Sequence, residues 1–428
     1  MLGSGCIGPE HGDARCSVMK DNMKFKFLVY SRTLRSVALI YMALASPLYL
    51  NLIGMNVADI GIVYAGLMLF LVFMNFFLGM LGDRFGYKKA LILGEVPPLL
   101  GSLLMWHSSS IYLIVLAVVI GGIGGLAGGF RGIFSAGMTA IIVSNYPKEQ
   151  DRVKKMSTLI RYAALGSVAG GVLLLSQTLL QTDLGDVGAY RMLFLISALF
   201  IFSSFVSLIF IKEKVRPRKT TKIMRRSSLS YTLRVIYLNA INGFGLGLAI
   251  PLLPLFFKLA FHLHGDTTAA IIGMVYIPAY LASSAGARFY GIHPNRLGIV
   301  NVASISRSIS GVLLMAMGVV FAVGYTMPYS TWLFAAAALL YIARSFIGGI
   351  GVTSISIVNL GGVHNEDYGT ASSIQGIAGS LSMSSSGLSG YLVDLWMPAP
   401  LFLGGLFQIG GGILYKRALG KRYSNGKK

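Results

Sequence analysis

The sequence predicts an all-α integral membrane protein with twelve transmembrane helices in two six-helix bundles. Of its 428 residues, 55% are hydrophobic and only 12% are charged, and the mean hydropathy is +0.71. A soluble domain usually carries about 25% charged residues, so this chain lacks the means to cover a water-exposed surface. Apolar stretches of about 20 residues, enough to span a bilayer as helix, follow one another along the chain. The short alternating segments of about 10 residues that form barrels are missing.

The apolar stretches define the predicted helices, and a dense run of basic residues after the sixth divides them into two bundles. The predicted spans are residues 34–54, 59–82, 88–106, 112–143, 155–180, 190–211, 232–257, 268–288, 297–324, 331–360, 369–393 and 399–415. We expect a disordered tail over 1–30, one bundle over 31–211, a basic linker over 212–231, a second bundle over 232–418 and a basic tail over 419–428.

The formal net charge of +21 is explained by topology rather than by nucleic-acid binding. Most of the 36 Lys and Arg fall in the N-terminal segment, the loops after spans two and four, the linker and the C-terminal tail. Twelve spans place all these segments on one side, and basic loops stay cytoplasmic. We therefore expect both termini in the cytoplasm. We also expect a monomer in the cytoplasmic membrane, whose partners are lipid and a small solute.

Side chains for catalysis or metal binding are missing from the predicted spans. Cys6 and Cys16 lie in the N-terminal tail, and all six histidines lie in the tail or in loops. No nucleotide-binding P-loop pattern occurs. An enzyme, a metal site and a cofactor are therefore not expected.

The two predicted bundles repeat one order of features. Pro47 precedes the segment Gly82-Asp83-Arg84-Phe85 by 35 residues, and Pro251 precedes Gly286-Ala287-Arg288-Phe289 by the same interval. This order indicates a duplicated six-helix unit. Transporters built from such repeats bind their substrate near the membrane midplane, between the repeats.

A specific motif follows the second span, where the chain reads Gly79-Met80-Leu81-Gly82-Asp83-Arg84-Phe85-Gly86-Tyr87-Lys88-Lys89. It resembles the signature between helices two and three of the major facilitator superfamily. The start of span six, the loop after span four, and Arg344 with the glycines after it are similar to further motifs of that family. The resemblance covers nearly all of residues 30–418 and implies a secondary transporter that works by alternating access.

The resemblance also implies a gate. In the family, the residue matching Asp83 helps to latch the cytoplasmic side against the start of helix eleven, here near 369–371. The glycines permit a tight turn and close helix approach. Asp83 is alternatively a charge that anchors the topology at the membrane edge. The expected gating residues are Gly79, Gly82, Asp83, Arg84, Gly86, Lys88 and Lys89.

Arginines inside the spans are the main candidates for solute binding, because a charge there costs at least about 2.5–3.5 kcal/mol and is functional by default. Arg131 and Arg344 lie at mid-bilayer depth, and the resemblance implies that they face each other across a central cavity, flanked by Arg161. Guanidinium groups suit carboxylates, phosphates or dense hydroxyls. Alternatively, both brace helices through hydrogen bonds. Arg307 is expected to snorkel or to bond backbone carbonyls.

Uncharged polar residues and one acid complete the candidate site. Asn239, Asn242 and Gln375 are expected to contact the solute or, equally, to make packing hydrogen bonds. Glu95 is a candidate for proton coupling or the salt-bridge partner of a nearby arginine.

The predicted function is secondary active transport of a small anionic or polyhydroxylated solute, with proton coupling as an option. One alternative is a multidrug efflux permease of the same superfamily, although cationic drugs usually require more acids inside the spans than this chain has. An alternative of another class is a non-transporting membrane sensor.

Overall fold

The computed structural model describes residues 12–122, 137–138, 141–142, 145–146, 149–211, 213, 224–263, 267–292, 298–327, 330–364 and 367–425, and all regular elements within these ranges are helices. The predicted all-α class is confirmed. The first half contains α1 (Gly12–Leu52), α2 (Val57–Phe85), α3 (Tyr87–His107), α4 (Ile111–Gly121), α6 (Glu149–Leu175) and α7 (Gln177–Ile209). The second half contains α8 (Arg226–Ala249), α9 (Leu253–Ala260), α10 (Thr268–Ile292), α11 (Ile299–Thr326), α12 (Thr331–Leu360), α13 (Tyr368–Met383), α14 (Ser386–Leu395) and α15 (Ala399–Asn425).

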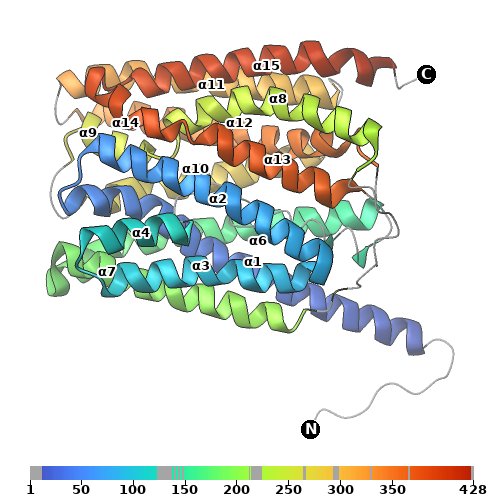
Figure 1. Cartoon of the computed structure of the whole chain (residues 1–428). Coiled ribbons are helices and arrows are strands. Elements are labelled where there is room, and N and C mark those ends of the chain that lie inside the picture. Colours follow the sequence, from blue (N-terminus) through green and yellow to red (C-terminus); the bar gives the residue numbers. More distant parts are fainter. Residues whose placement is uncertain are drawn as a thin grey trace, which may run out of the picture.

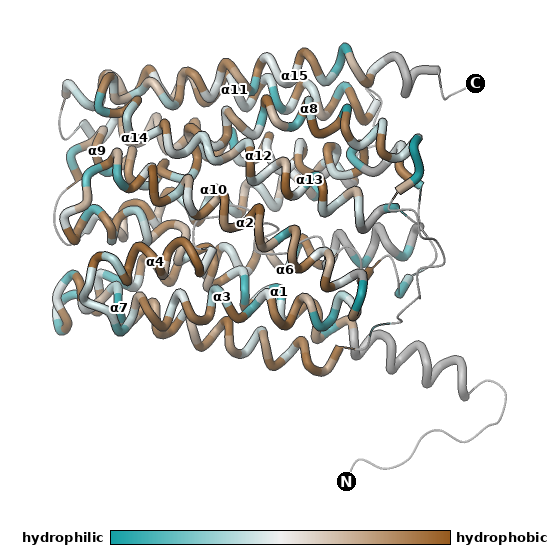
Figure 2. Tube along the Cα trace, viewed as in Figure 1, coloured by the Kyte–Doolittle hydropathy of each residue, from teal (hydrophilic) through white to brown (hydrophobic). Residues whose placement is uncertain are grey.

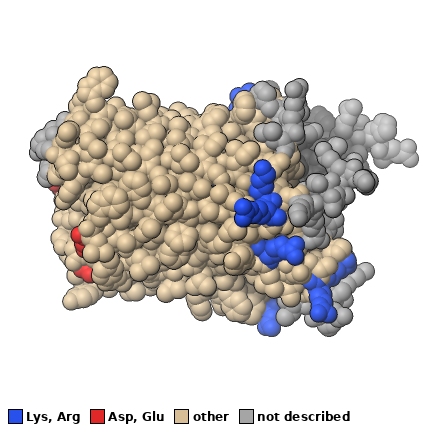
Figure 3. Space-filling model, turned by 90° about the horizontal axis from the view of Figure 1, so that it is seen from above, with Lys and Arg blue, Asp and Glu red and all other residues tan. Residues whose placement is uncertain are grey.

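The helices lie side by side, and both ends of the chain lie at the same end of the bundle (Figure 1). We call this the termini end and the opposite one the distal end. Apolar residues dominate the helices between the two ends (Figure 2). On the face shown in Figure 3, Lys and Arg gather toward the termini end, whereas the acidic side chains lie at the distal end. This polarity is the one that a membrane-spanning chain with basic loops on one side would have.

Within the described ranges, nine helical segments are long and apolar enough to cross a membrane. The other predicted spans are interrupted or less apolar: α4 ends at Gly121, span eleven is divided into α13 and α14, and glycines lower the hydropathy of α15. The count of twelve spans, the side on which the termini lie and the boundaries of the two bundles therefore stay predictions.

The N-terminal tail differs from the expectation of disorder over 1–30, because α1 already begins at Gly12. Residues 13–30 contain neither proline nor glycine, so nothing in them breaks the helix that continues into the first span. Phe25 and Leu28 are buried in the main core. Their burial ties this part of the helix to the bundle. Likewise, α8 begins at Arg226, inside the segment predicted as linker.

The seventh predicted span is not one continuous helix. It divides into α8 and α9 around Pro251, because proline has no N–H for the helical ladder and its ring clashes with the carbonyl four residues earlier. Span eleven divides as well, at Ser384 and Ser385. Ser385 donates to the carbonyl of Phe244 at 2.7 Å, and Ser389 donates to the carbonyl of Leu248. Serines in and just after the break of span eleven thus bond carbonyls of α8 near the break at Pro251. Such bonds matter because backbone carbonyls inside a membrane must be satisfied within the protein.

Helix packing within the second half depends on backbone contact between α10 and α12. A Cβ added at Gly349 would overlap the carbonyl oxygen of Ser283, whereas one added at the adjacent Gly348 would meet nothing within 4 Å. Small residues allow this close approach.

We therefore expect Gly349→Ala to destabilise the protein by about 1–3 kcal/mol, because α10 and α12 must separate to fit the methyl group. Gly348→Ala is the matched control on the same helix and should be neutral or slightly stabilising. Thermal unfolding of both variants in detergent checks this. Equal midpoints for the two would contradict the packing described.

The two halves meet mainly in the distal part of the molecule. There α2 packs against α14, α6 against α10, and α1 against α9. Gly61 and Gly390 bring the backbones of α2 and α14 together, and a Cβ on Gly61 would lie 3.1 Å from the amide nitrogen of Gly390. Further toward the termini end, Asn75 of α2 lies beside Gly376 of α13. The distal end is thus closed by helix contacts between the halves.

Candidate functional site

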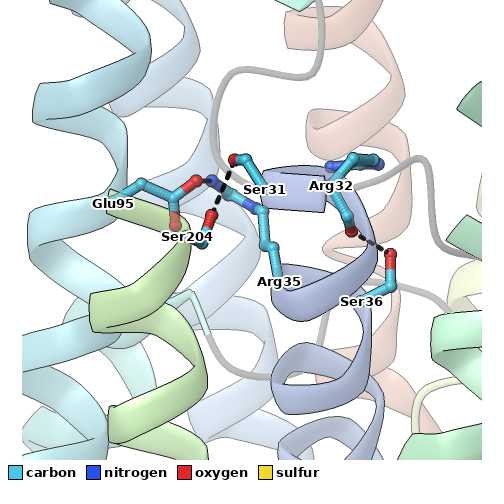
Figure 4. Close-up of polar contacts among 6 residues, drawn as sticks. All are labelled: Ser31, Arg32, Arg35, Ser36, Glu95 and Ser204. Atoms are coloured by element: carbon cyan, nitrogen blue, oxygen red, sulfur yellow. Dashed lines mark hydrogen bonds and ion pairs between the residues drawn. The ribbon is translucent and has the colours of Figure 1, made fainter. Parts of the chain in front are cut away.

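A buried ion pair joins the first and third helices of the first half. Arg35 on α1 donates through Nη1 to the Oε1 carboxylate oxygen of Glu95 on α3, and the side chains are 2% and 0% exposed (Figure 4). The helix of Glu95 also contains Pro97 and Pro98, yet it runs unbroken from Tyr87 to His107. Glu95 was predicted either to pair with an arginine or to couple protons. The structure contains the salt bridge to an arginine. The role of Glu95 in proton coupling stays a prediction.

Further polar residues surround this pair. Ser31 hydrogen bonds Ser204 of α7 at 2.8 Å, which links α1 to another helix one turn before Arg35. Arg32 is 3% exposed, and Figure 4 shows it pointing away from Glu95. Two guanidinium groups and one carboxylate therefore lie inside the bundle. Neither Arg32 nor Arg35 was predicted to lie in the interior, because both adjoin the basic N-terminal segment.

The second half contains a similar polar bridge. Arg307 on α11 donates to the amide oxygen of Asn239 on α8, and its guanidinium lies 4.2 Å from the ring centre of Tyr415 on α15. Asn239 in turn donates to Asn359 of α12 at 3.2 Å. The expectation that Arg307 snorkels is wrong: it is 5% exposed and has partners inside the half-bundle, because a cation inside lipid is stabilised by polar and aromatic groups. The alternative, bonding to backbone carbonyls, stays a prediction.

The other amide residues predicted to contact solute also have neighbours inside the second half. Gln375 on α13 donates to the backbone carbonyl of Asn359 at 3.0 Å. The Cβ of Asn242 lies 3.4 Å from the place where a Cβ of Gly411 on α15 would be. The structure therefore places Asn239 and Gln375 around Asn359, and Asn242 against α15. These contacts are the packing interactions that the sequence analysis left open as an alternative.

Arg344 lies in the middle of α12 and makes a weak interhelical contact. Its Nη2 lies 3.4 Å from the Oε1 atom of Gln408 on α15, at the limit of a hydrogen bond. Tyr341, one turn away, packs against Tyr276 of α10 with tilted rings whose centres are 4.9 Å apart, and the ring centre of Tyr280 lies 6.0 Å from that of Tyr276. We call these five residues the Arg344 cluster.

The Arg344 cluster has spare hydrogen-bonding capacity. Arg344 Nε, Gln408 Nε2 and the Tyr280 hydroxyl are buried and have no hydrogen-bond partner among the residues that the structure describes. Buried polar atoms are nearly always paired, so atoms without a partner in one cluster mark a place for a ligand or water. All three atoms carry hydrogens. The cluster is therefore suited to accept an oxygen-rich group.

The remaining predicted binding residues are not brought into this cluster. Arg131 lies outside the described residues, so its predicted position opposite Arg344 stays a prediction. Arg161 on α6 is exposed. Arg344 contacts Gln408 within its own half.

The motif after span two forms the turn between α2 and α3. Gly79 and Gly82 lie in the last turns of α2, and Gly86 forms the turn itself with a φ of 97°, which favours glycine. Arg84 and Lys89 are exposed, and the Asp83 side chain lies outside the described residues. The latch predicted for Asp83 therefore stays a prediction.

An acid that the sequence analysis overlooked holds this turn in place. Glu213 follows α7, and its carboxylate accepts from the amides of Tyr87 at 2.9 Å and Lys88 at 2.8 Å, the first residues of α3. A carboxylate at a helix start offsets unpaired N–H groups and the helix dipole. Lys88 Nζ donates to the carbonyl of Ile209 at 2.6 Å. The only feature of the sequence that could have indicated this role is the position of Glu213, an acid inside the basic linker.

A polar contact joins the two halves at the distal end. Lys258 on α9 donates through Nζ to the Oδ1 atom of Asn51 on α1 at 2.6 Å, and the Asn51 amide donates to the carbonyl of Met55 at 3.2 Å. Beside this contact lies a pocket with walls from both halves, lined by Leu48, Leu52, Gln177, Gln181, Asp186, Tyr190, Lys258, Thr268 and Ala269. We call the Lys258–Asn51 contact the distal latch.

Comparison with known proteins identifies the family. Residues 31–387 match the model of the Major Facilitator Superfamily. No curated protein sequence matches the chain. Among solved structures, the human organic anion transporter MFSD10 (TETRAN) superimposes with a TM-score of 0.63 at 16% identity, over 93% of this chain and 99% of that one. A point mutant of the nucleoside transporter NupG superimposes with a TM-score of 0.66 at 14% identity, over 92% of this chain and 99% of that one.

The match covers most of the chain, and the two solved structures share its fold over nearly their whole length. The helical bundle, the glycine turn at Gly86 and the apolar spans agree with this result. The predicted family is confirmed: the chain belongs to the Major Facilitator Superfamily, as a multi-pass membrane transporter of small molecules and not an enzyme.

Proposed function

We propose that this transporter moves a small anionic or polyhydroxylated solute across the cytoplasmic membrane by alternating access, with its termini in the cytoplasm. The observation that carries the substrate class is the Arg344 cluster, where three buried hydrogen-bond donors have no partner within the described part of the chain. Carboxylate and hydroxyl oxygens accept hydrogen bonds from such donors, and the fixed positive charge favours an anion.

The charge distribution supports the same substrate class. The buried carboxylates among the described residues are Glu95 and Asp367. Glu95 already holds Arg35, and Asp367 accepts from the amide of Arg225 at 3.3 Å. No described carboxylate forms a salt bridge with Arg344. A cationic solute would therefore meet a guanidinium without a counter-ion, which disfavours it.

The closed distal end supports alternating access. Helix contacts and the distal latch close the route between the halves at that end. With cytoplasmic termini, this conformation is closed toward the outside. A transporter must also adopt the opposite conformation, in which the latch is broken.

Uptake into proteoliposomes tests the proposal, with radiolabelled organic anions, neutral polyols and organic cations compared with and without a pH gradient. We expect saturable uptake of an anion or polyol, and stimulation by the gradient if Glu95 or another group couples protons. Uptake of cations alone would overturn the substrate class, and uptake of none would leave the sensor interpretation in its place.

Replacing Arg344 by Gln is expected to reduce transport of that solute by about 10- to 100-fold, because a hydrogen bond to a charged group is worth about 1.5–3 kcal/mol. Arg344→Lys keeps the charge but loses the paired donors, so it should restore only part of the activity. Arg288→Gln on the exposed part of α10 is the control. Normal uptake by Arg344→Gln at equal protein level would exclude Arg344 as a ligand.

A further inference from the structure

The two buried polar bridges described above occupy corresponding places in the repeated halves. Arg35 and Asn239 are 204 residues apart, the same interval that separates Pro47 from Pro251. Both lie on the first helix of their half, α1 and α8. Their partners Glu95 and Arg307 lie on the third helix of each half, α3 and α11. The two bridges differ in which helix carries the arginine: Arg35 lies on the first helix of its half, whereas Arg307 lies on the third helix of its half.

At the distal latch, α1 meets α9, the helix that follows α8 after the break at Pro251. Asn51 lies 16 residues beyond Arg35 on α1, or about 24 Å along the helix axis. Lys258 lies 19 residues beyond Asn239 and follows the break at Pro251. Besides its packing within its own half, where α1 contacts α6 and α7 and α8 contacts α13 and α15, each first helix has a polar tie to its own third helix nearer the termini end. At the distal end, α1 is joined to α9.

We propose that the Arg35–Glu95 and Arg307–Asn239 bridges are positioning residues that make each first helix move with its own half, and that they thereby set how firmly the distal latch closes. Each first helix already packs against other helices of its half, and the bridge adds a buried polar tie to the third helix. This tie fixes the first helix relative to the third helix, so that movement of the bundle reaches the latch. Coupling of this kind between distant sites is typically worth about 5- to 150-fold in an equilibrium.

The bridges are suited to this role because they are costly to break. Arg35, Glu95 and Arg307 are at most 5% exposed. In a low-dielectric interior, water cannot replace a lost partner. The backbone contacts between α2 and α14 also close the distal end, and α14 is tied to α8 through Ser389, but these contacts involve neither bridge.

Cysteine labelling at the distal end tests the proposal. The sequence has two cysteines, so Cys6→Ser and Cys16→Ser give a background without thiols. Leu48→Cys then places a thiol in the distal pocket, at a position that is 2% exposed in the closed conformation. Tyr112→Cys, at a residue that is 83% exposed at the start of α4, reports reagent access alone.

In this background, Glu95→Gln and Asn239→Ala should each raise the rate of maleimide labelling at Leu48→Cys by at least about fivefold. Neither should change the rate at Tyr112→Cys. Ser102→Ala is the matched control, because Ser102 is fully buried on α3 but bonds only carbonyls of its own helix. Glu95→Asp, which retains the charge, should restore most of the closed state.

Labelling rates in Glu95→Gln and Asn239→Ala that equal the rate in Ser102→Ala would overturn the proposal. If Glu95→Gln does not fold, Asn239→Ala, a change at a half-buried residue, decides the outcome by itself. This inference rests on the proposed alternating access only in treating distal opening as a step of transport. The labelling rate itself can be measured without a substrate. A normal labelling response without solute uptake would therefore contradict the proposed function and leave the role of the bridges intact.

Discussion

Replacing Arg35 by Met is expected to lower the free energy of unfolding by about 3–5 kcal/mol, the largest stability effect that we expect from a single side chain in this protein. Glu95 is 0% exposed, so the change leaves a carboxylate inside the bundle without its cation. Arg32 also interacts electrostatically with Glu95, but it is Arg35 that donates the hydrogen bond to this carboxylate (Figure 4). Equilibrium unfolding in mixed micelles with a denaturing detergent measures the loss.

The double variant Arg35→Met/Glu95→Leu separates the cost of an unpaired charge from the value of the pair. Apolar residues of similar volume can replace a buried pair at little cost. We therefore expect the double variant to be more stable than Arg35→Met alone. A loss equal to that of Arg35→Met alone would show that the pair itself, rather than the stranded carboxylate, carries the energy, whereas additive losses would show that the two side chains act separately. Ser102→Ala again controls for loss of a buried polar group on α3.

Replacing Lys258 by Met is expected to open the distal end about tenfold more often, because it removes a hydrogen bond from a charged donor worth about 1.5 kcal/mol at this half-buried position. The opening is measured as the maleimide labelling rate at Leu48→Cys. Asn51→Leu removes the acceptor of the same bond and should have a similar effect. Lys258→Arg keeps a cationic donor and should stay near the original rate.

The distal latch also makes a prediction for paired changes. Combining Lys258→Met with Asn51→Leu should raise labelling no further than either change alone, because both remove one interaction. Multiplied effects would show that Lys258 and Asn51 act separately. An unchanged rate in Lys258→Met would mean that helix contacts such as that between Gly61 and Gly390 close the distal end without the latch.

Much of the fold was predictable from local sequence. The supply of charged residues and the length of the apolar stretches predicted a helical membrane protein, and the glycine-acid-basic motif predicted its family. The break of span seven was less accessible: Pro47 sits inside a continuous α1, whereas Pro251 ends α8. Whether a helix can end inside the membrane depends on what satisfies the carbonyls of its last turn, and here Ser389 of a distant segment bonds the carbonyl of Leu248.

The candidate site likewise contains residues that the sequence predicted and residues that it did not. Glu95 and Arg344 were found from the sequence because a charge inside an apolar stretch is conspicuous. Arg32 and Arg35 were missed because they adjoin a basic segment that sequence alone assigns to the membrane surface. Arg307 was found but given the wrong surroundings, since its depth in the span says nothing of the direction in which the side chain points.

What the sequence determined by itself was the class of the protein, the order of its apolar segments and the family motif. Each of these depends on residues near one another in the chain. Only the tertiary structure decided which charges meet. Arg35 and Glu95 are 60 residues apart, and Asn239 and Arg307 are 68. Such pairing depends on how each helix is rotated about its axis against its neighbours, which is set by packing across the whole bundle.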